Sequence, residues 1–218
     1  MKTLLSLCVS ALLLSACSKK ADDVIQNARE AAKDKDLQEK TFVSECSATP
    51  IEALLTGLFT LFKASVKGQT TAYRVEGARI TRTTTAYSAA NCSGDPAFTF
   101  LEKGTVSINK DEKYRSNDGG YLIDFDFDKL SVSIGDDAGV KVADGIKLCG
   151  LADWTTKSDR EVTQQSKDVN CYGSALPRHV SNRYKLDGNI LYLGTPTKGE
   201  TTDSQRPASL STTRYTAK

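Results

Sequence analysis

Tyr121-Leu122-Ile123-Asp124-Phe125-Asp126-Phe127 is the stretch that most directly indicates how this chain folds. In its second half apolar and acidic side chains alternate one by one, and successive side chains of a β-strand point to opposite faces of a sheet. The pattern therefore predicts a half-buried strand with Phe125 and Phe127 on its inner face. The carboxylates on its outer face are those of Asp124, Asp126 and Asp128.

Similar strand patterns continue along most of the chain. Segments rich in Thr, Val, Ile and Tyr, as strands are, are separated by turn signals such as Asn117-Asp118-Gly119-Gly120 and Asp187-Gly188-Asn189. About eight to ten strands in one meander favour a mainly β fold, an antiparallel barrel, with a β-sandwich as the alternative. The other predicted strands lie within residues 41–46, 70–85, 98–108, 130–134, 145–149, 182–186, 190–193 and 212–215.

Residues 50–63 depart from this pattern and form the most apolar segment after the N-terminus. Pro50 stands where helices often start, and the large apolar side chains that follow recur at helical spacing. We predict a helix packed on the core; a lid over a barrel mouth and a membrane or partner contact are the alternatives. The apolar side chains are those of Ile51, Leu54, Leu55, Leu58, Phe59 and Phe62.

The N-terminus indicates export. Lys2 precedes an apolar run from Leu4 to Leu14, and its length of about 11 residues is too short for a membrane-spanning helix but fits the core of a signal peptide. Leu14-Ser15-Ala16-Cys17 resembles the lipobox of bacterial lipoproteins. The resemblance implies cleavage before Cys17, acylation of its thiol and attachment to a membrane through that lipid, because two or more chains anchor firmly.

The residue after the lipobox bears on localisation. In lipoproteins of well-studied Gram-negative bacteria, Asp at this position retains the protein on the inner membrane, whereas this chain has Ser18. The resemblance therefore implies the cell envelope, at the outer membrane. We divide the chain into a signal peptide (1–16), a lipidated cysteine with a polar tether and a short helix (17–38), and one β-barrel domain (39–218).

Six cysteines are present, of which Cys8 leaves with the signal peptide and Cys17 carries the lipid. Four remain, and an even number in an oxidising compartment predicts two disulfides. A zinc site is disfavoured because no Cys-x-x-Cys pair occurs. Three pairings are possible, and segments that are close in sequence are usually neighbours in space. This favours Cys46 with Cys92, and Cys149 with Cys171.

Charge and motifs exclude several classes of function. The 29 basic and 27 acidic residues are spread along the chain, which argues against nucleic acid as a partner. No phosphate-binding glycine loop or dinucleotide fingerprint occurs, so we expect no cofactor. A calcium loop starting at Asp124 would need glycine at 129 and an acidic ligand at 135, where Lys129 and Gly135 stand. We therefore expect no metal.

His179 is the only histidine. A Ser-His-Asp or Cys-His catalyst would have to be built on it, and no nucleophile motif surrounds it. We interpret it as an exposed histidine in a loop between two strands, and we predict no catalytic residues. An envelope hydrolase using paired carboxylates is the alternative.

The meander, the cysteine bridges and the late hairpin over Tyr184–Leu193 resemble the lipocalin-like (calycin) β-barrels across roughly residues 37–216. The chain departs from the family's Gly-x-Trp signature, because Lys40-Thr41-Phe42 stands on the first strand and the only tryptophan is Trp154. Arg206, before the last strand, stands at a position similar to the family's closing arginine. The resemblance implies a barrel and, as ligand, a small apolar molecule.

From these observations we predict a non-catalytic, membrane-anchored lipoprotein whose β-barrel binds a small apolar ligand. Its partners would be the membrane, through Cys17, and that ligand or an envelope protein. A protein-interaction module, such as an inhibitor, adhesin or envelope-assembly subunit, is the alternative, and the envelope hydrolase is a second one.

Overall fold

A computed structural model describes residues 34–48, 66–194 and 201–218 of the chain. In this part the protein is mainly β, with one short α-helix, α3 (Asp137–Gly145). No helix in the described ranges has the length and apolar character needed to cross a membrane. The strands are β1 (Thr41–Ser44), β2 (Gly68–Glu76), β3 (Arg79–Tyr87), β4 (Pro96–Asn109), β5 (Tyr121–Ile134), β6 (Arg160–Glu161), β7 (Arg178–Asp187), β8 (Ile190–Gly194) and β9 (Leu210–Ala217).

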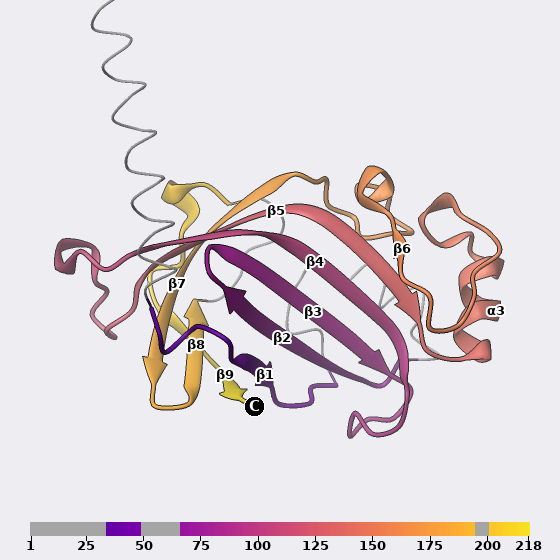
Figure 1. Cartoon of the computed structure of the whole chain (residues 1–218), viewed down its shortest axis with the longest axis horizontal. Coiled ribbons are helices and arrows are strands. Elements are labelled where there is room, and N and C mark those ends of the chain that lie inside the picture. Colours follow the sequence, from indigo (N-terminus) through magenta and orange to yellow (C-terminus); the bar gives the residue numbers. More distant parts are fainter. Residues whose placement is uncertain (1–33, 49–65, 195–200) are drawn as a thin grey trace, which may run out of the picture.

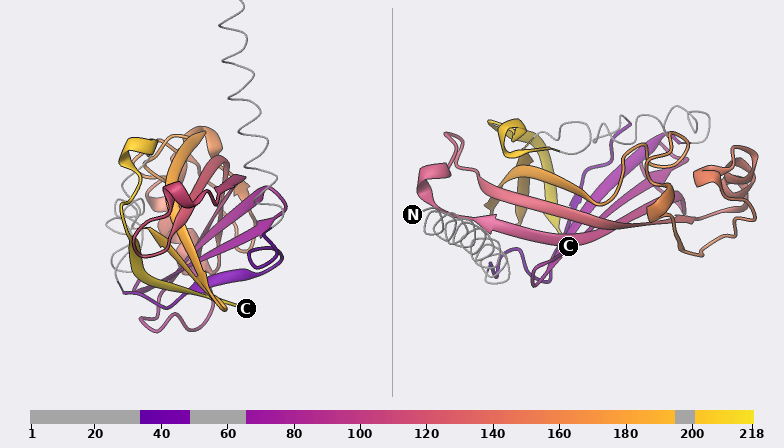
Figure 2. Two further views of the ribbon diagram at one scale, coloured as in Figure 1. Left: turned by 90° about the vertical axis from the view of Figure 1, so that its left-hand side faces the viewer. Right: turned by 90° about the horizontal axis from the view of Figure 1, so that it is seen from above.

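Eight of these strands close into an antiparallel barrel (Figure 1, and end-on in Figure 2, left). Neighbours in the barrel follow the order of the chain from β1 to β5 and from β7 to β9, and β9 pairs with β1. The short strand β6 pairs with the far end of β5, beyond the part of β5 that pairs with β7. The predicted meander barrel is therefore confirmed, and the sandwich alternative is not what forms.

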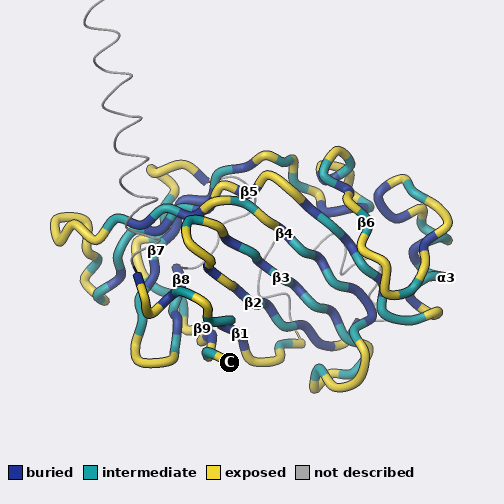
Figure 3. The backbone as a smooth tube through the Cα atoms, viewed as in Figure 1, coloured by how far each residue is buried: buried dark blue, intermediate teal, exposed yellow. Residues whose placement is uncertain are grey.

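Strand β5 shows why this sequence makes a barrel wall. Phe125 and Phe127 are 3% and 0% exposed, whereas Asp126 and Asp128 lie on the outer surface, as the alternation predicts. Figure 3 shows the same alternation of buried and open residues along the other long strands. At Gly104 of β4 the pairing with β5 shifts register. Any side chain there would collide with the backbone carbonyl of Asp126, so the bulge requires glycine.

The predicted turns join neighbouring strands. The segment 70–85, interrupted at Gly77, forms the hairpin of β2 and β3, and Asp187-Gly188-Asn189 lies at the turn between β7 and β8. Gly77 and Gly188 have φ of 61° and 59°, a left-handed conformation that glycine adopts without strain. Both hairpins are confirmed.

The predicted strand at 145–149 is wrong. Asp136 caps α3 by accepting a hydrogen bond from the amide of Gly139, and the helix runs to Gly145. A 3-10 turn, Leu148–Gly150, follows, and its apolar side chains are buried against the barrel. A short apolar run is compatible with a strand or with a buried helical turn, so its length and composition did not decide between them. The predicted helices at 50–63 and within the tether lie outside the described residues.

Both favoured disulfides are present. Cys46–Cys92 joins the segment after β1 to the loop between β3 and β4, with the two Cα atoms 5.8 Å apart. Cys149–Cys171, with Cα atoms 4.2 Å apart, fastens the segment that follows α3. Each bridge closes a loop between elements that are near in sequence, as the pairing argument assumed.

The barrel holds two apolar clusters. The α3-end cluster lies where α3 and its following segment cover the far ends of β4 and β5, and it includes Phe98, Phe100, Leu130, Val132, Trp154 and Tyr172. The hairpin-end cluster lies at the end formed by β7, β8 and β9, and it includes Phe42, Tyr73, Phe125, Phe127, Tyr184 and Tyr215. Figure 2 (right) shows α3 at the end of the molecule opposite β7–β9.

Aromatic rings fill the hairpin end. The ring of Tyr73 lies 5.9 Å from that of Phe125 and 5.3 Å from that of Tyr215, centroid to centroid. The last residues of the predicted tether already pack here: Leu37 is buried, and the carboxylate of Asp34 accepts a hydrogen bond of 2.9 Å from the Tyr184 hydroxyl. This end of the barrel is a packed core.

Candidate functional site

A layer of polar side chains lies inside the barrel between the two apolar clusters. Cross-strand register places Thr71 opposite Thr84 and, two residues on, Arg82 opposite Glu102. All of them are buried on the inner face, where apolar side chains are the usual occupants. We call this set the polar layer, and it consists of Gln69, Thr71, Arg82, Thr84, Glu102 and Arg178.

Glu102 of β4 is the centre of a buried charged network. It forms ion pairs with Arg82 of β3 and with Arg178 of β7, whose Nη2 lies 2.5 Å from Glu102 Oε1. The Tyr172 hydroxyl donates to Glu102 Oε2 at 2.8 Å and accepts from Arg82 at 2.7 Å. The network therefore joins three strands and the segment that follows α3.

The two arginines keep Glu102 ionised. Burial by itself would raise the pKa of the Glu102 carboxyl, but the positive charges of Arg82 and Arg178 and the hydrogen bond from Tyr172 hold it below its ordinary value. These partners stabilise the ionised form of the buried carboxylate. Removing one of them would leave a buried charge without full compensation.

Several polar atoms of the layer have no hydrogen-bond partner in the described structure. They are Arg178 Nε and Nη1, both side-chain atoms of Gln69, and Thr71 Oγ1. None of these atoms is open to solvent, and a buried donor or acceptor without a partner costs about 1–3 kcal/mol. The polar layer therefore contains more buried hydrogen-bond donors and acceptors than its described residues satisfy.

Aromatic faces surround the arginines of the layer. The guanidinium carbon of Arg82 lies 4.7 Å from the centroid of the Phe127 ring, and that of Arg178 lies 5.4 Å from the same ring. Arg178 also lies 5.3 Å from the ring centroid of Tyr172. These cation–π contacts favour the buried charges, but they do not provide acceptors for the N–H groups.

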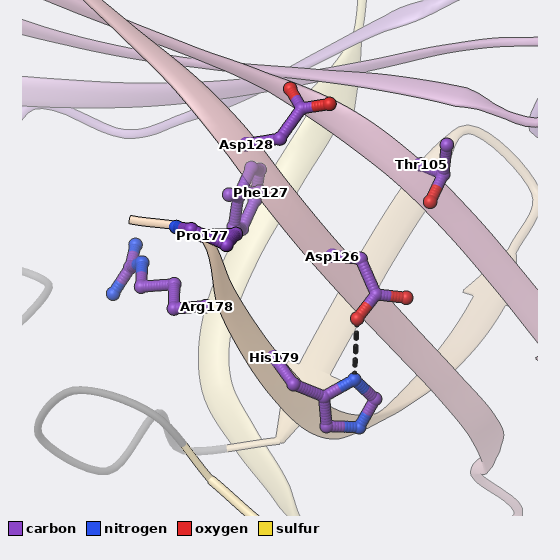
Figure 4. Close-up of a pocket in the computed structure, with 7 residues that line it drawn as sticks. All are labelled: Thr105, Asp126, Phe127, Asp128, Pro177, Arg178 and His179. Carbon is purple, nitrogen blue, oxygen red and sulfur yellow. Dashed lines mark hydrogen bonds and ion pairs between the residues drawn. The ribbon is translucent and has the colours of Figure 1, made fainter. Parts of the chain in front are cut away.

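A second polar constellation lies on the outer face, where β5 and β7 pair. The prediction that His179 is a loop residue is wrong: it lies in β7, directly opposite Asp126 of β5, with Nδ1 2.7 Å from Asp126 Oδ1. The pair lies beside an open groove of about 310 Å³. Figure 4 shows the hydrogen-bonded pair, with Arg178 on the other side of the β7 ribbon. The hydrogen bond to Asp126 raises the pKa of His179, against the opposing effect of burial.

Ser181, His179 and Asp126 form the hydrogen-bonded series that serine hydrolases use. The Ser181 Oγ lies 3.0 Å from His179 Nε2, on the opposite ring nitrogen from Asp126. Ser181 is only 1% exposed, however, because the segment at Thr201 runs along β7 beside it. Its hydroxyl also lies 3.2 Å from Asp203 Oδ1. A nucleophile must reach its substrate, so this geometry supports no hydrolase.

Arg206 neutralises the acidic groups beside His179. Its Nη2 lies 2.7 Å from Asp124 Oδ1 and 2.6 Å from Asp203 Oδ1, and its Nη1 donates to the backbone carbonyls of Ile123 and Asn182. Asp124, His179 and Asp203 lie close enough together to share a metal ion. The Arg206 guanidinium already supplies the positive charge at this position. The cluster therefore serves to hold the segment before β9 against β5 and β7.

The polar layer was not predicted from the sequence. Arg82, Glu102 and Arg178 stand in segments that look like ordinary strand or turn sequence, and charged residues are common on outer faces. One signal was available: counting by twos from Ile80 places Arg82 and Thr84 on the same face as an apolar residue. None of the cysteines belongs to the layer, and Cys17 lies outside the described residues.

No protein-family model matches this chain, and no curated protein matches its sequence.

Proposed function

We propose that this protein is a bacterial lipoprotein, anchored in the outer membrane by lipid on Cys17, whose β-barrel binds a small, largely apolar ligand without converting it. Three observations support the proposal: the lipobox Leu14-Ser15-Ala16-Cys17, the closed barrel, and a polar layer whose buried groups are incompletely satisfied.

Gln69 is the observation that carries the ligand-binding part. It lies on the inner face of β2 and is 0% exposed, yet neither Nε2 nor Oε1 of its side-chain amide has a hydrogen-bond partner in the described structure. Across the sheet it pairs with Ala86, which in turn pairs with Phe98 of the α3-end cluster. A ligand with an apolar body and one polar group would contact both kinds of surface, as ligands do in mostly apolar pockets.

Packing favours the α3 end of the barrel as the place of the proposed ligand. The hairpin end is filled by its aromatic rings, and Gln69 lies at the other end of β2, beside the α3-end cluster. The ligand would therefore lie between the polar layer and the α3-end cluster.

Native mass spectrometry of the full chain extracted from its host tests the proposal. The wild-type protein should carry a small molecule in addition to the mass of the lipidated chain. Gln69→Leu should lose that mass, because it removes the polar partner and fills the space with an apolar side chain. Gln164→Leu, at an exposed position, should retain it. A bare lipidated chain in repeated wild-type preparations would count against ligand binding.

The packed hairpin end favours one other candidate, a protein-interaction module, because a solid barrel presents only its outer surface. The same measurement separates the two candidates. A barrel that never carries a small molecule but co-purifies with an envelope protein would be such a module.

A further inference from the structure

We propose that the hairpin end of the barrel faces the anchoring bilayer, with Tyr114 against the phospholipid head groups, and that the α3 end points away from the membrane. This inference rests on the proposed function, because it requires the lipid on Cys17. It deepens that function by placing the end that would receive the ligand on the aqueous side. It arises from the point where the chain enters the barrel and from an exposed aromatic side chain beside that point.

The chain enters the barrel at the hairpin end, and side-chain contacts fix the entry point. The carboxylate of Asp34 accepts a hydrogen bond of 2.9 Å from the Tyr184 hydroxyl and lies 2.8 Å from Lys110 Nζ. The side-chain amide of Gln38 accepts from the backbone N–H of Gly77 at 2.6 Å and donates to its carbonyl at 3.3 Å. These residues are part of the barrel, so the chain that links the lipid to the barrel ends at Asp34.

The reach of that linking chain limits how the barrel can stand on the membrane. Asp34 follows Cys17 by 17 residues, which span at most about 60 Å when fully extended. Strand β5 runs for 14 residues from Tyr121, opposite Tyr184, to Ile134 in the α3-end cluster, a length of about 46 Å. A barrel standing on its α3 end would lift Asp34 by up to that distance. A barrel standing on its hairpin end needs none of this reach.

Tyr114 is exposed at the same end. It lies in the loop between β4 and β5, which Figure 1 shows at the end of the molecule opposite α3. The residue is 45% exposed, Lys113 Nζ lies 4.6 Å from its ring centroid, and its backbone carbonyl accepts from Arg183 at 2.7 Å. Tyrosine and lysine favour membrane interfaces, because each joins an apolar part to a polar end. Lys110, which binds Asp34, begins this loop, so an interfacial side chain lies where the chain from the lipid enters the barrel.

Ion pairs within the loop indicate that zwitterionic lipid is a sufficient partner. Lys113 Nζ lies 2.7 Å from Asp111 Oδ2, and Arg115 Nη1 lies 3.3 Å from Glu112 Oε2. Because these charges are balanced locally, the contact depends on the ring of Tyr114 rather than on attraction to anionic lipid. One aromatic contact is weak by itself. The covalent link to the lipid makes it intramolecular, so a weak affinity is enough to hold this end at the surface.

Tryptophan fluorescence tests the orientation, since Trp154, the only tryptophan, lies in the α3-end cluster. The lipidated full chain is inserted into phosphatidylcholine vesicles that carry a nitroxide quencher on the head group, with nitroxide-free vesicles as the blank. Wild type should keep the emission of Trp154. In Tyr114→Trp the added emission should be quenched, because the new ring would lie among the head groups.

Val169→Trp is the matched control. Tyr114 and Val169 are the large apolar residues exposed in the described ranges, at 45% and 76%, and Val169 stands two residues before Cys171 of the α3-end disulfide. Its replacement therefore adds an exposed tryptophan at the opposite end of the barrel. The added emission in Val169→Trp should be quenched several-fold less than that in Tyr114→Trp.

Hydrogen exchange tests the contact itself. On vesicles, the backbone amides of residues 110–120 should exchange several-fold more slowly than in Cys17→Ser in solution. Tyr114→Ser should remove most of this protection, because it deletes the ring that contacts the head groups. Both Tyr114 substitutions are at an exposed position, so the barrel should fold in each variant.

The outcomes separate this inference from the anchor on which it rests. In a chain that carries lipid on Cys17 and floats with vesicles, equal quenching in the two tryptophan variants, stronger quenching in Val169→Trp, or quenching in neither would overturn the orientation and leave the anchor intact. Protection of residues 110–120 that Tyr114→Ser does not reduce would overturn the contact through Tyr114. A wild-type chain that carries no lipid and stays in solution would overturn the inference together with the proposed anchor.

Discussion

Asp126 and His179 are 53 residues apart in the sequence but directly opposite each other on β5 and β7, with Asp126 Oδ1 2.7 Å from His179 Nδ1. The pair makes the only histidine of the chain part of the barrel wall. It also makes the stability of the barrel depend on pH, because the charged form of His179 is the form that Asp126 stabilises.

The hydrogen bond to Asp126 raises the pKa of His179 in the folded protein above its unfolded value of about 6.5. The stabilisation is therefore fully present below about pH 6.5 and is lost as the pH rises through the folded-state pKa. Asp126→Asn should lower the free energy of unfolding by less than about 1 kcal/mol at low pH, because the pair is partly exposed, and by a smaller amount at higher pH. Urea denaturation across this range measures the difference.

Asp128→Asn is the control for this prediction, since Asp128 lies on the same outer face of β5 and is exposed. It should give no pH-dependent difference from wild type. A loss in Asp126→Asn that is the same at every pH would show that the titration of His179 does not contribute.

The buried network predicts a large effect of a small substitution. Glu102→Gln removes the carboxylate that pairs with the buried Arg178 and that also contacts Arg82, and we expect a loss of about 3–5 kcal/mol in the free energy of unfolding. Glu76→Gln is the matched control, because Glu76 pairs with Arg74 on the outer face with both side chains about half exposed; its loss should stay below about 1 kcal/mol. Equal losses in the two variants, measured by chemical denaturation, would show that Glu102 does not hold the interior together.

The two disulfides should open in a fixed order. Cys46 is exposed, whereas Cys149 and Cys171 are both buried in the α3-end cluster, and thiolate attack requires access to the sulfur. A titration with reductant, followed by alkylation and mass spectrometry, should label Cys46 and Cys92 before the other pair. Simultaneous labelling of all four would indicate that the α3 end opens as readily as the loops outside the barrel.

The anchor is tested at Cys17. Cys17→Ser should leave a chain without lipid and without the firm membrane attachment that acyl chains give, as followed by mass spectrometry and membrane fractionation. Cys8→Ser, inside the predicted signal peptide, should be lipidated like wild type. A Cys17→Ser protein that is still lipidated would overturn the assignment of the lipobox.

Much of the barrel was predictable because the information is local. Alternation over Ile123–Phe127 predicts which side of β5 is buried, and the glycine turns at Gly77 and Gly188 predict the hairpins on either side of them. Pairing of sequence neighbours in a meander then follows from short connections, which is also why the two favoured disulfides are the ones that form.

What the sequence did not reveal is which residues the closed barrel brings together. Leu148 and Cys149 pack as a helical turn because the disulfide and the ends of β4 and β5 offer them a core, which no local pattern shows. Arg178 and Glu102 are 76 residues apart, and their contact requires the register shift at Gly104 and the closure of β5 against both β4 and β7. The sequence by itself thus determined most of the strands, the turns and the order of the strands in the barrel. These depend on the period of the side chains and on the backbone conformation at the turns. Only the tertiary structure decided that a charged layer lies inside, because that depends on register and closure, which set one strand's inner residues against another's.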